Sequence, residues 1–285
     1  MNLIEKNDAM CWFKVVGGSV IATVGTYLIW KKLSGKRKSR EEYPKDTVIL
    51  HQYGRAPYAP ICHHFAIKLE TYLRMAKIPY MNVHSRVGSK KGKFPWIEYN
   101  NESIADTQFC IEYLNKTLAI DLNKNFSKAE RGIARSFLKM LEENTYWALL
   151  LERWILDPEF SICKIIKLPY RFAWFIRRRL RRDAYGHGIG RHSQDEIYHI
   201  MDLDLMALSE FLGDKKFLLG DRPCEEDCAI FGQLAEWYWQ SFGHRSGPLI
   251  KKYKNLCDYC ERMKETFWPD WDECNTNGGK KEATK

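Results

Sequence analysis

Hydrophobic and polar positions divide this chain into one long apolar run, a stretch of short strand-like runs and a longer stretch with helical spacing. The apolar run covers residues 12–30, where Lys14 is the one charged side chain. This length approaches the roughly 20 residues that a transmembrane helix needs. Residues 47–53 predict a short buried strand, and apolar residues recur at helical spacing over 62–76. Further along, the pattern predicts a strand over 80–84, a hairpin over 94–105 and a helix that opens at 106–107.

The apolar run is followed directly by six cations within residues 31–40. The positive-inside rule then places the rest of the chain in the cytosol, and the same cluster would attract anionic lipid headgroups. A cleavable signal peptide would begin with basic residues, whereas Glu5 and Asp8 precede the run here. We therefore predict that residues 1–45 anchor a single-pass membrane protein, which contacts the bilayer through 12–30 and through the basic residues that follow.

The order of elements after this anchor is β-α-β, a loop, and then β-β-α. Because a helix joins the first two strands, we expect them to be parallel, with a right-handed crossover. Pro95 follows a loop rich in Gly and Lys and begins the third strand. This place suits a cis peptide bond, which is rare outside fixed turns.

The remainder of the chain shows helical spacing over residues 121–272. Residues 127–130 and 193–196 both have the Ser-x-x-Glu spacing of a capping box, so each predicts the start of a long helix. The glycine-rich residues 186–191 lack the spacing of a phosphate-binding loop and predict a tight connector between helices. Residues 273–285 are polar, and we predict that they form a disordered tail.

Several separated segments carry a resemblance to a known family. Within residues 46–272, these segments are, in order, KLETYLRMAKIPY, GKFPWIEYN, GHGIGR and FLLGDRPCEEDCAIFGQL. They resemble the failed axon connections family, which is related to the metaxins and includes nematode cadmium-responsive proteins. The segment FPWIEYNNESIADTQFCIEYL also resembles glutathione transferases. The resemblance implies an α+β fold with a thioredoxin-like domain over 46–120 and an all-helical, glutathione transferase-like domain over 121–272, preceded by one transmembrane helix.

The same resemblance implies a glutathione site. In glutathione transferases, an acidic or amide residue followed by Ser or Thr opens the third helix and binds the γ-glutamyl end of glutathione; Asp106 and Thr107 occupy that place. A helix N-terminus offers unpaired N–H groups to a carboxylate. The backbone of Phe94, ahead of Pro95, would bind the peptide part of the ligand. The alternative is that Asp106 or Thr107 only caps the helix.

Two residues are candidates for activating the ligand's thiol. Glutathione transferases use a Tyr near the end of the first strand, or a Ser or Cys at the start of the first helix. Tyr53 fits the first place and Cys62 approximates the second, where a helix N-terminus would lower the pKa of a thiol. Relatives carry Ser-Pro-Phe-Cys here, whereas this chain has Cys62, His63 and His64 in sequence. Cys62 also opens the apolar face of its helix, so the alternative is a core cysteine.

The net charge of +9 is concentrated in clusters. Besides residues 31–40, six cations lie within 171–182. A nucleic-acid-binding domain spreads its basic residues over a face, so this distribution argues against nucleic acid as a partner. Residues 171–182 are amphipathic. They predict either contact with an anionic membrane surface or a solvated helix that packs Phe172, Phe175 and Ile176 inward.

The chain has nine cysteines, an odd number that favours reduced thiols over a disulfide framework. Cys257 and Cys260 lie one helical turn apart and could share a soft metal ion. However, Cys260 falls within an apolar helical stripe that predicts a core helix, and no second Cys-x-x-Cys pair completes a tetrahedral site. We therefore predict no metal site.

These expectations support two functions. One is a membrane-anchored, glutathione S-transferase-like protein that binds glutathione or a related thiol and takes part in the response to cadmium or other toxicants. The alternative is a non-catalytic, metaxin-like adaptor at an organelle membrane, which binds a protein partner or a second copy of the chain. The lysosomal and mitochondrial outer membranes are the candidate locations.

Overall fold

The computed structural model describes residues 43–277 and 283–285, and Lys45–Lys285 form one compact unit. Among the described residues, every helix is too short or too polar to cross a bilayer. The predicted membrane span at 12–30 and the basic residues at 31–40 lie outside the described residues, so they stay predictions.

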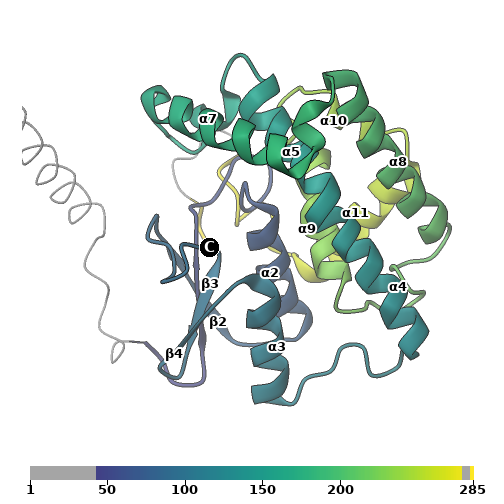
Figure 1. The fold of residues 1–285 in the computed structure, drawn as a ribbon. Helices are drawn as coiled ribbons and strands as arrows, with labels where there is room; N and C mark the ends of the chain where they lie inside the picture. The colour runs from purple at the N-terminus through teal and green to yellow at the C-terminus, as the bar shows by residue number, and fades with distance from the viewer. Residues whose placement is uncertain (1–42, 278–282) are drawn as a thin grey trace, which may run out of the picture. The chain divides into compact units, whose positions relative to one another are not determined.

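The first half of this unit contains a four-stranded mixed sheet (Figure 1). Its strands are β1 (Val48–Gln52), β2 (Tyr80–His84), β3 (Trp96–Tyr99) and β4 (Glu102–Ala105), arranged in the order β2-β1-β3-β4. Strand β1 pairs with β2 in parallel and with β3 antiparallel, and β3 pairs antiparallel with β4. The predicted β-α-β, loop, β-β-α order is confirmed.

Two helices, α2 (His64–Met75) and α3 (Thr107–Leu118), pack against one face of this sheet (Figure 1). Period-2 alternation sends every second side chain of a strand to the same face. Val48 and Leu50 of β1 therefore join Leu69 of α2 and Ile111 of α3 in one buried cluster. This packing fixes where both helices begin, and their N-terminal ends carry the candidate site residues.

The second half is helical. Its elements are α4 (Lys128–Lys139), the π-helical η2 (Met140–Thr145), α5 (Tyr146–Leu151), the π-helical η3 (Glu152–Leu156), α6 (Ser161–Ile165), α7 (Tyr170–His187), the 3-10 turn η4 (Ile189–Arg191), α8 (Gln194–Leu212), α9 (Asp227–Tyr238), α10 (Ser246–Ile250) and α11 (Lys254–Phe267). Both predicted capping boxes are present, with Ser127 and Ser193 accepting from the backbone N–H groups of Glu130 and Glu196. Of the predicted connector at residues 186–191, Gly186 and His187 end α7 and Ile189–Arg191 form the short turn η4.

Helix α9 joins the two halves because it packs directly against α2. Gly232 of α9 lies so close to α2 that a Cβ there would be 2.6 Å from the carbonyl oxygen of His64. Asp227, at the start of α9, is fully buried and accepts hydrogen bonds from the backbone N–H groups of Leu218 and Cys224. The phenol of Tyr259 donates to the same carboxylate at 2.8 Å.

Two parts of the chain differ from the sequence-based expectation. Phe172 and Phe175 of α7 do not pack inward: 46% and 63% of their surfaces are exposed, because Ala173 occupies the inner face instead. The first described residues of the predicted disordered tail at 273–285 also pack against the folded unit. Cys274 and Asn275 are buried, and the backbone N–H of Thr276 donates to the carbonyl of Ala56.

Cys260 lies in the core on α11, as the apolar stripe predicted, and Cys257 is half-buried. Within the described residues, no group of three or more His, Cys, Asp or Glu side chains is arranged to hold a metal ion.

Candidate functional site

The pairing of β3 with β4 brings together the residues that the sequence singled out. Trp96 lies opposite Ala105 in the antiparallel register. Pro95 immediately precedes Trp96 and Asp106 immediately follows Ala105, so the two meet at the same end of the hairpin. The Phe94–Pro95 peptide bond is cis, as predicted.

Asp106 is the N-cap of α3, and its carboxylate accepts from the backbone N–H of Gln108 at 3.2 Å. Its φ of 82° is uncommon for a residue with a side chain. Lys93 forms an ion pair with it, with 2.8 Å between Nζ and Oδ2. Burial raises the pKa of Asp106, but the hydrogen bond and charge of Lys93 outweigh this effect and lower it. Asp106 is therefore an anion at neutral pH.

Thr107 begins α3 and is only 5% exposed. A ligand at this helix end would therefore meet the backbone N–H groups and Asp106 more readily than the Thr107 hydroxyl. Since the first N–H groups of a helix lack partners within the helix, they form a site for an anionic group.

Tyr53 follows β1 and lies at the same edge of the sheet. Its ring stacks on Phe94 with 4.5 Å between centroids, and His63 meets it edge-on at 5.5 Å. The side chain is partly accessible, at 39% exposed. Burial raises the pKa of Tyr53 although the charge of Arg86 opposes the change. Tyr53 is therefore a neutral phenol that can donate a hydrogen bond.

Cys62 has a different environment from the one predicted. It precedes the N-cap of α2, His63, and Arg153 Nη1 donates to its sulfur at 3.5 Å. Burial raises the pKa of Cys62 to about 12, and the opposing charge of Arg153 does not compensate. The expected lowering of the thiol pKa is thus reversed, because loss of solvent outweighs the nearby positive charge.

Comparison with known proteins agrees with this architecture. The family models for the Glutathione S-transferase N-terminal domain and the Glutathione S-transferase, C-terminal domain match residues 64–160 and 201–263. The chain is 30% identical to failed axon connections of Drosophila melanogaster over 262 residues, 83% of this chain and 62% of that protein. It is 19% identical to metaxin-2 of Mus musculus, over 72% of this chain and 82% of the relative. The chain belongs to the metaxin and glutathione S-transferase-like family.

Members of this family differ in what their names describe. An isoprene-epoxide–glutathione S-transferase of Rhodococcus is 29% identical over 63% of this chain and 79% of the relative. Among solved structures, a glutathione transferase of Bombyx mori has a TM-score of 0.54 and 16% identity, covering 84% of this chain and 97% of that one. That likeness shows the shared fold. The chain spans 62% of the length of failed axon connections.

The sequence analysis did not identify Arg153, whose guanidinium contacts Cys62. Arg153 is 5% exposed and pairs with buried Glu236 at 2.6 Å. It also donates to the carbonyl of Gln240 at 3.1 Å. The available signal was Glu152-Arg153 inside the otherwise apolar segment ALLLERWIL, since a charged pair in an apolar helix implies buried partners.

His63 and His64 were noted only as a departure from the family pattern. Burial and the charge of Arg153 lower the pKa of His63 to about 4, and burial also lowers the pKa of His64 well below its ordinary value. Both imidazoles are therefore neutral around pH 7. His64 lies 4.6 Å from the ring of Tyr146, so these rings line the start of α2.

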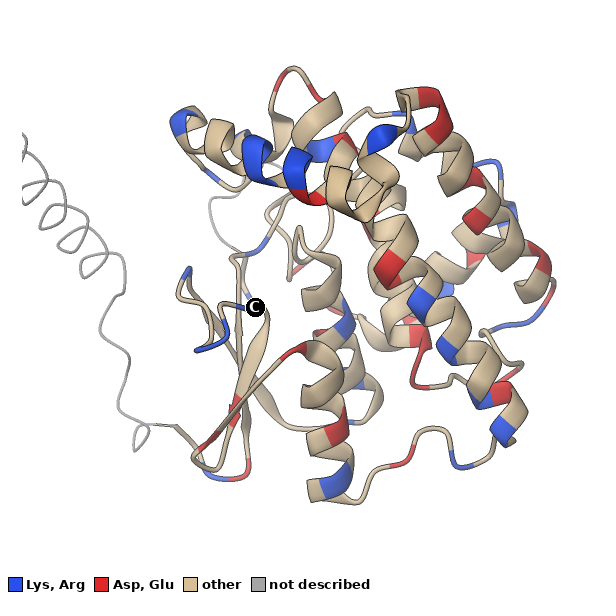
Figure 2. Ribbon diagram, in the orientation of Figure 1, with Lys and Arg blue, Asp and Glu red and all other residues tan. Residues whose placement is uncertain are grey.

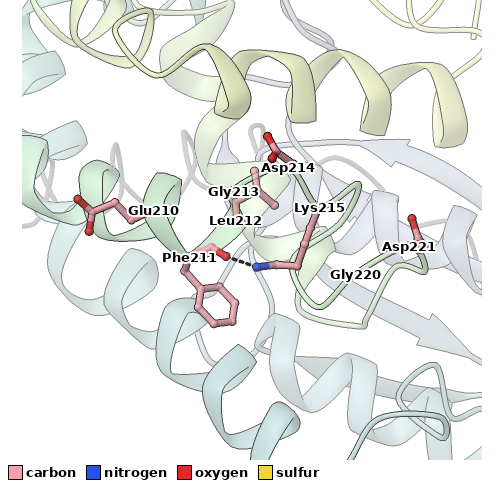
Figure 3. A pocket seen from close by; sticks show the side chains of 8 residues that line it. All are labelled: Glu210, Phe211, Leu212, Gly213, Asp214, Lys215, Gly220 and Asp221. Carbon is pink, nitrogen blue, oxygen red and sulfur yellow. Dashed lines mark hydrogen bonds between the residues drawn. The ribbon is translucent and has the colours of Figure 1, made fainter.

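The hollows of the described surface include two that lie away from this site. One, of 410 Å³, is lined by Glu210, Lys215 and Asp221 among others, and there the Lys215 ammonium donates to the carbonyl of Phe211 (Figure 3). A second, of 650 Å³, lies on α7. Neither of these two hollows is lined by Pro95 or Thr107.

Proposed function

We propose that this chain binds glutathione, or a closely related γ-glutamyl thiol, along the edge formed by Phe94, Pro95, Asp106 and Thr107. The observation that carries the proposal is the register of β3 with β4, which sets Pro95 beside the N-terminus of α3. The similarity to an isoprene-epoxide–glutathione S-transferase supports it.

Each end of the ligand has a counterpart at this edge. The Asp106 carboxylate suits the α-ammonium of a γ-glutamyl group, and the α3 N-terminus suits the neighbouring carboxylate. The backbone of Phe94 would pair with the ligand's own peptide groups. Lys93 holds Asp106 now, but 58% of the Lys93 side chain is exposed, so it can turn away into solvent.

The chemistry that follows uses Tyr53 rather than Cys62. At neutral pH, Cys62 remains a thiol, because burial raises its pKa to about 12. The neutral phenol of Tyr53 could donate to the ligand's sulfur and stabilise a thiolate. The thiol proton would pass to solvent, and the thiolate would attack an electrophilic carbon. A C–S bond would form as the bond from that carbon to its leaving group breaks, and the leaving group would depart with the electron pair or, as an opened epoxide oxygen, take a proton from water.

A second candidate is a non-catalytic, metaxin-like adaptor. Two observations favour it: Arg153 and Glu236 pair inside the core beside Cys62, and Asp106 already has a partner in Lys93. A transferase fold can serve binding without its chemistry. In that case, the surface rather than the Pro95 edge would bind a protein partner or a second copy.

Calorimetric titration of glutathione into the full chain tests the first candidate. We expect a Kd at or below the millimolar range, and Asp106→Ala should weaken binding at least tenfold because the ammonium loses its counter-charge. Asp221→Ala is the matched control, since 85% of that side chain is exposed away from the edge. Absence of binding at millimolar glutathione would refute the proposal.

Turnover with a model electrophile separates the two candidates. If the chain is a transferase, Tyr53→Phe should lower kcat at least tenfold, whereas Cys62→Ser should preserve most activity. Glutathione binding without turnover by the unchanged chain would favour the adaptor.

We also propose that residues 1–45 anchor the chain at an organelle membrane, lysosomal or mitochondrial, with the folded unit in the cytosol. The apolar run and the cations that follow support this proposal. The double variant Ile21→Asp with Val24→Asp should be released from membranes by alkaline extraction. Release of the unchanged chain under the same conditions would contradict a transmembrane anchor.

A role in the response to cadmium remains part of the proposal, through thiol binding rather than a metal centre. In a cadmium titration, the double variant Cys257→Ser with Cys260→Ser should keep the affinity of the unchanged chain, because Cys260 is fully buried. A loss of affinity above tenfold would identify this pair as a metal site.

A further inference from the structure

Helix α7 presents large aromatic rings and arginines together to solvent. Trp174 and Phe175 are 58% and 63% exposed, and the cations concentrate along the same helix (Figure 2). We define the α7 outer surface as these exposed residues: Tyr170, Arg171, Phe172, Trp174, Phe175, Arg178, Arg179, Arg181 and Arg182. Four exposed aromatic side chains within six residues, of which Trp174 and Phe175 are in ring contact, exceed what single scattered apolar residues explain.

The inner face of α7 accounts for this orientation. Ala173 and Ala184 are its buried residues, and their small side chains let the helix lie close to the elements beneath. Arg177 turns inward, donating to the carbonyl of Ile155 at 2.8 Å and lying over the ring of Phe160. The helix therefore packs through the face that carries its small buried residues, and rotating it to bury Trp174 would break these contacts.

Within the described part of the chain, the charge of the outer surface has one carboxylate partner. Arg179 and Arg182 both reach one carboxylate, that of Asp183, at 3.4 and 3.0 Å. Arg178 lies 5.9 Å from the ring of Trp174. Phe175 and these three arginines line the hollow of 650 Å³, which therefore offers guanidinium groups to an anion beside an apolar ring.

We propose that the α7 outer surface binds the anionic phospholipid surface of a bilayer. Guanidinium groups pair with phosphate oxygens, and aromatic rings prefer the level of the headgroups. Arginines and aromatics interleaved along one convex helix match a helix that lies in the interface plane. A single nucleic-acid strand would instead need a basic groove that follows several phosphates.

Peptide-resolved hydrogen exchange on the full chain tests this proposal, because it reports on α7 whether or not residues 1–45 hold the chain to the vesicle. The protein is mixed with vesicles of phosphatidylcholine, with or without phosphatidylserine. We expect amide exchange over 170–187 to slow at least tenfold only with phosphatidylserine, and the protection to be lost at high salt.

Matched variants make the result specific. Arg178→Gln with Arg179→Gln and Arg182→Gln should abolish the protection, as should Trp174→Ala with Phe175→Ala. The control variant removes three exposed cations outside α7, through Lys124→Gln, Lys128→Gln and Arg135→Gln. It should retain the protection from exchange over 170–187. Equal protection on neutral vesicles, protection that survives the α7 variants, or the same protection by single-stranded RNA without lipid would each overturn the proposal.

Discussion

Arg153 shows how a single residue determines the chemistry at the start of α2. Its guanidinium is buried and pairs with Glu236, and it also donates to the sulfur of Cys62. A buried cation is tolerated when its partners replace water. Loss of solvent, together with the negative charge of Glu236, outweighs the charge of Arg153 and raises the pKa of Cys62, so this thiol stays protonated at neutral pH.

The first prediction concerns the reactivity of Cys62. Its pKa of about 12 lies above the ordinary value of 9.0, so the thiolate fraction at pH 7 is about a thousandfold lower than that of an ordinary thiol. We expect iodoacetamide to alkylate Cys62 far more slowly in the folded chain than in urea, with a rate that rises as pH increases toward 12. Mass spectrometry of the labelled peptide measures it.

Equal alkylation rates for the folded and unfolded chain at pH 7 would contradict this assignment. The same outcome would restore Cys62 as a candidate nucleophile.

At the scale of elements, local sequence signals located the strands of the sheet and the starts of several helices. Strand β2 occupies the predicted residues 80–84, strands β3 and β4 lie within the predicted hairpin over 94–105, and both capping boxes open their helices. These features depend on neighbours within a few positions, which a sequence displays directly. Helix α9 is different, because its start is held by Asp227 through partners on a preceding loop and on α11.

The second prediction is that Asp227→Ala lowers the free energy of unfolding by about 3 kcal/mol, because it leaves the buried N–H groups of Leu218 and Cys224 without acceptors. Urea denaturation followed by circular dichroism measures the change. Asp221→Ala is the control and should stay within about 0.5 kcal/mol. Similar stability of the two variants would show that Asp227 does not anchor α9.

At the scale of the whole molecule, the contact of α2 with α9 joins the sheet-containing half to the helical half. One buried cluster contains Ile61 and Ile67 from the first half together with Phe231 and Leu234 of α9. The C-terminal residues return to the first half as well, where Arg74 pairs with Asp270 and lies 3.9 Å from the ring of Trp268. The two halves therefore share a core.

The third prediction uses two glycines in helices. Gly232→Ala should destabilise the chain by about 2–3 kcal/mol, because its Cβ would lie 2.6 Å from the His64 carbonyl oxygen, a backbone atom that cannot move away freely. Gly132→Ala on α4 meets nothing within 4 Å and should stabilise by about 0.5–1 kcal/mol. Thermal unfolding of both variants checks the contrast. Equal shifts in Tm would contradict close packing of α2 on α9.

The sequence by itself determined the strand and helix order, the cis proline at Pro95 and the helix start at Asp106, because each depends on periodicity, capping or a resemblance within one short segment. Tertiary structure alone decided that Arg153 meets Glu236 and Cys62, that Lys93 pairs with Asp106, and which side of α7 faces solvent. These pairings join residues that are separated in sequence, and the burial of Cys62 beside Arg153 sets its pKa. The packing of α7 through its buried alanines leaves its aromatic rings exposed. Local patterns carry no record of either.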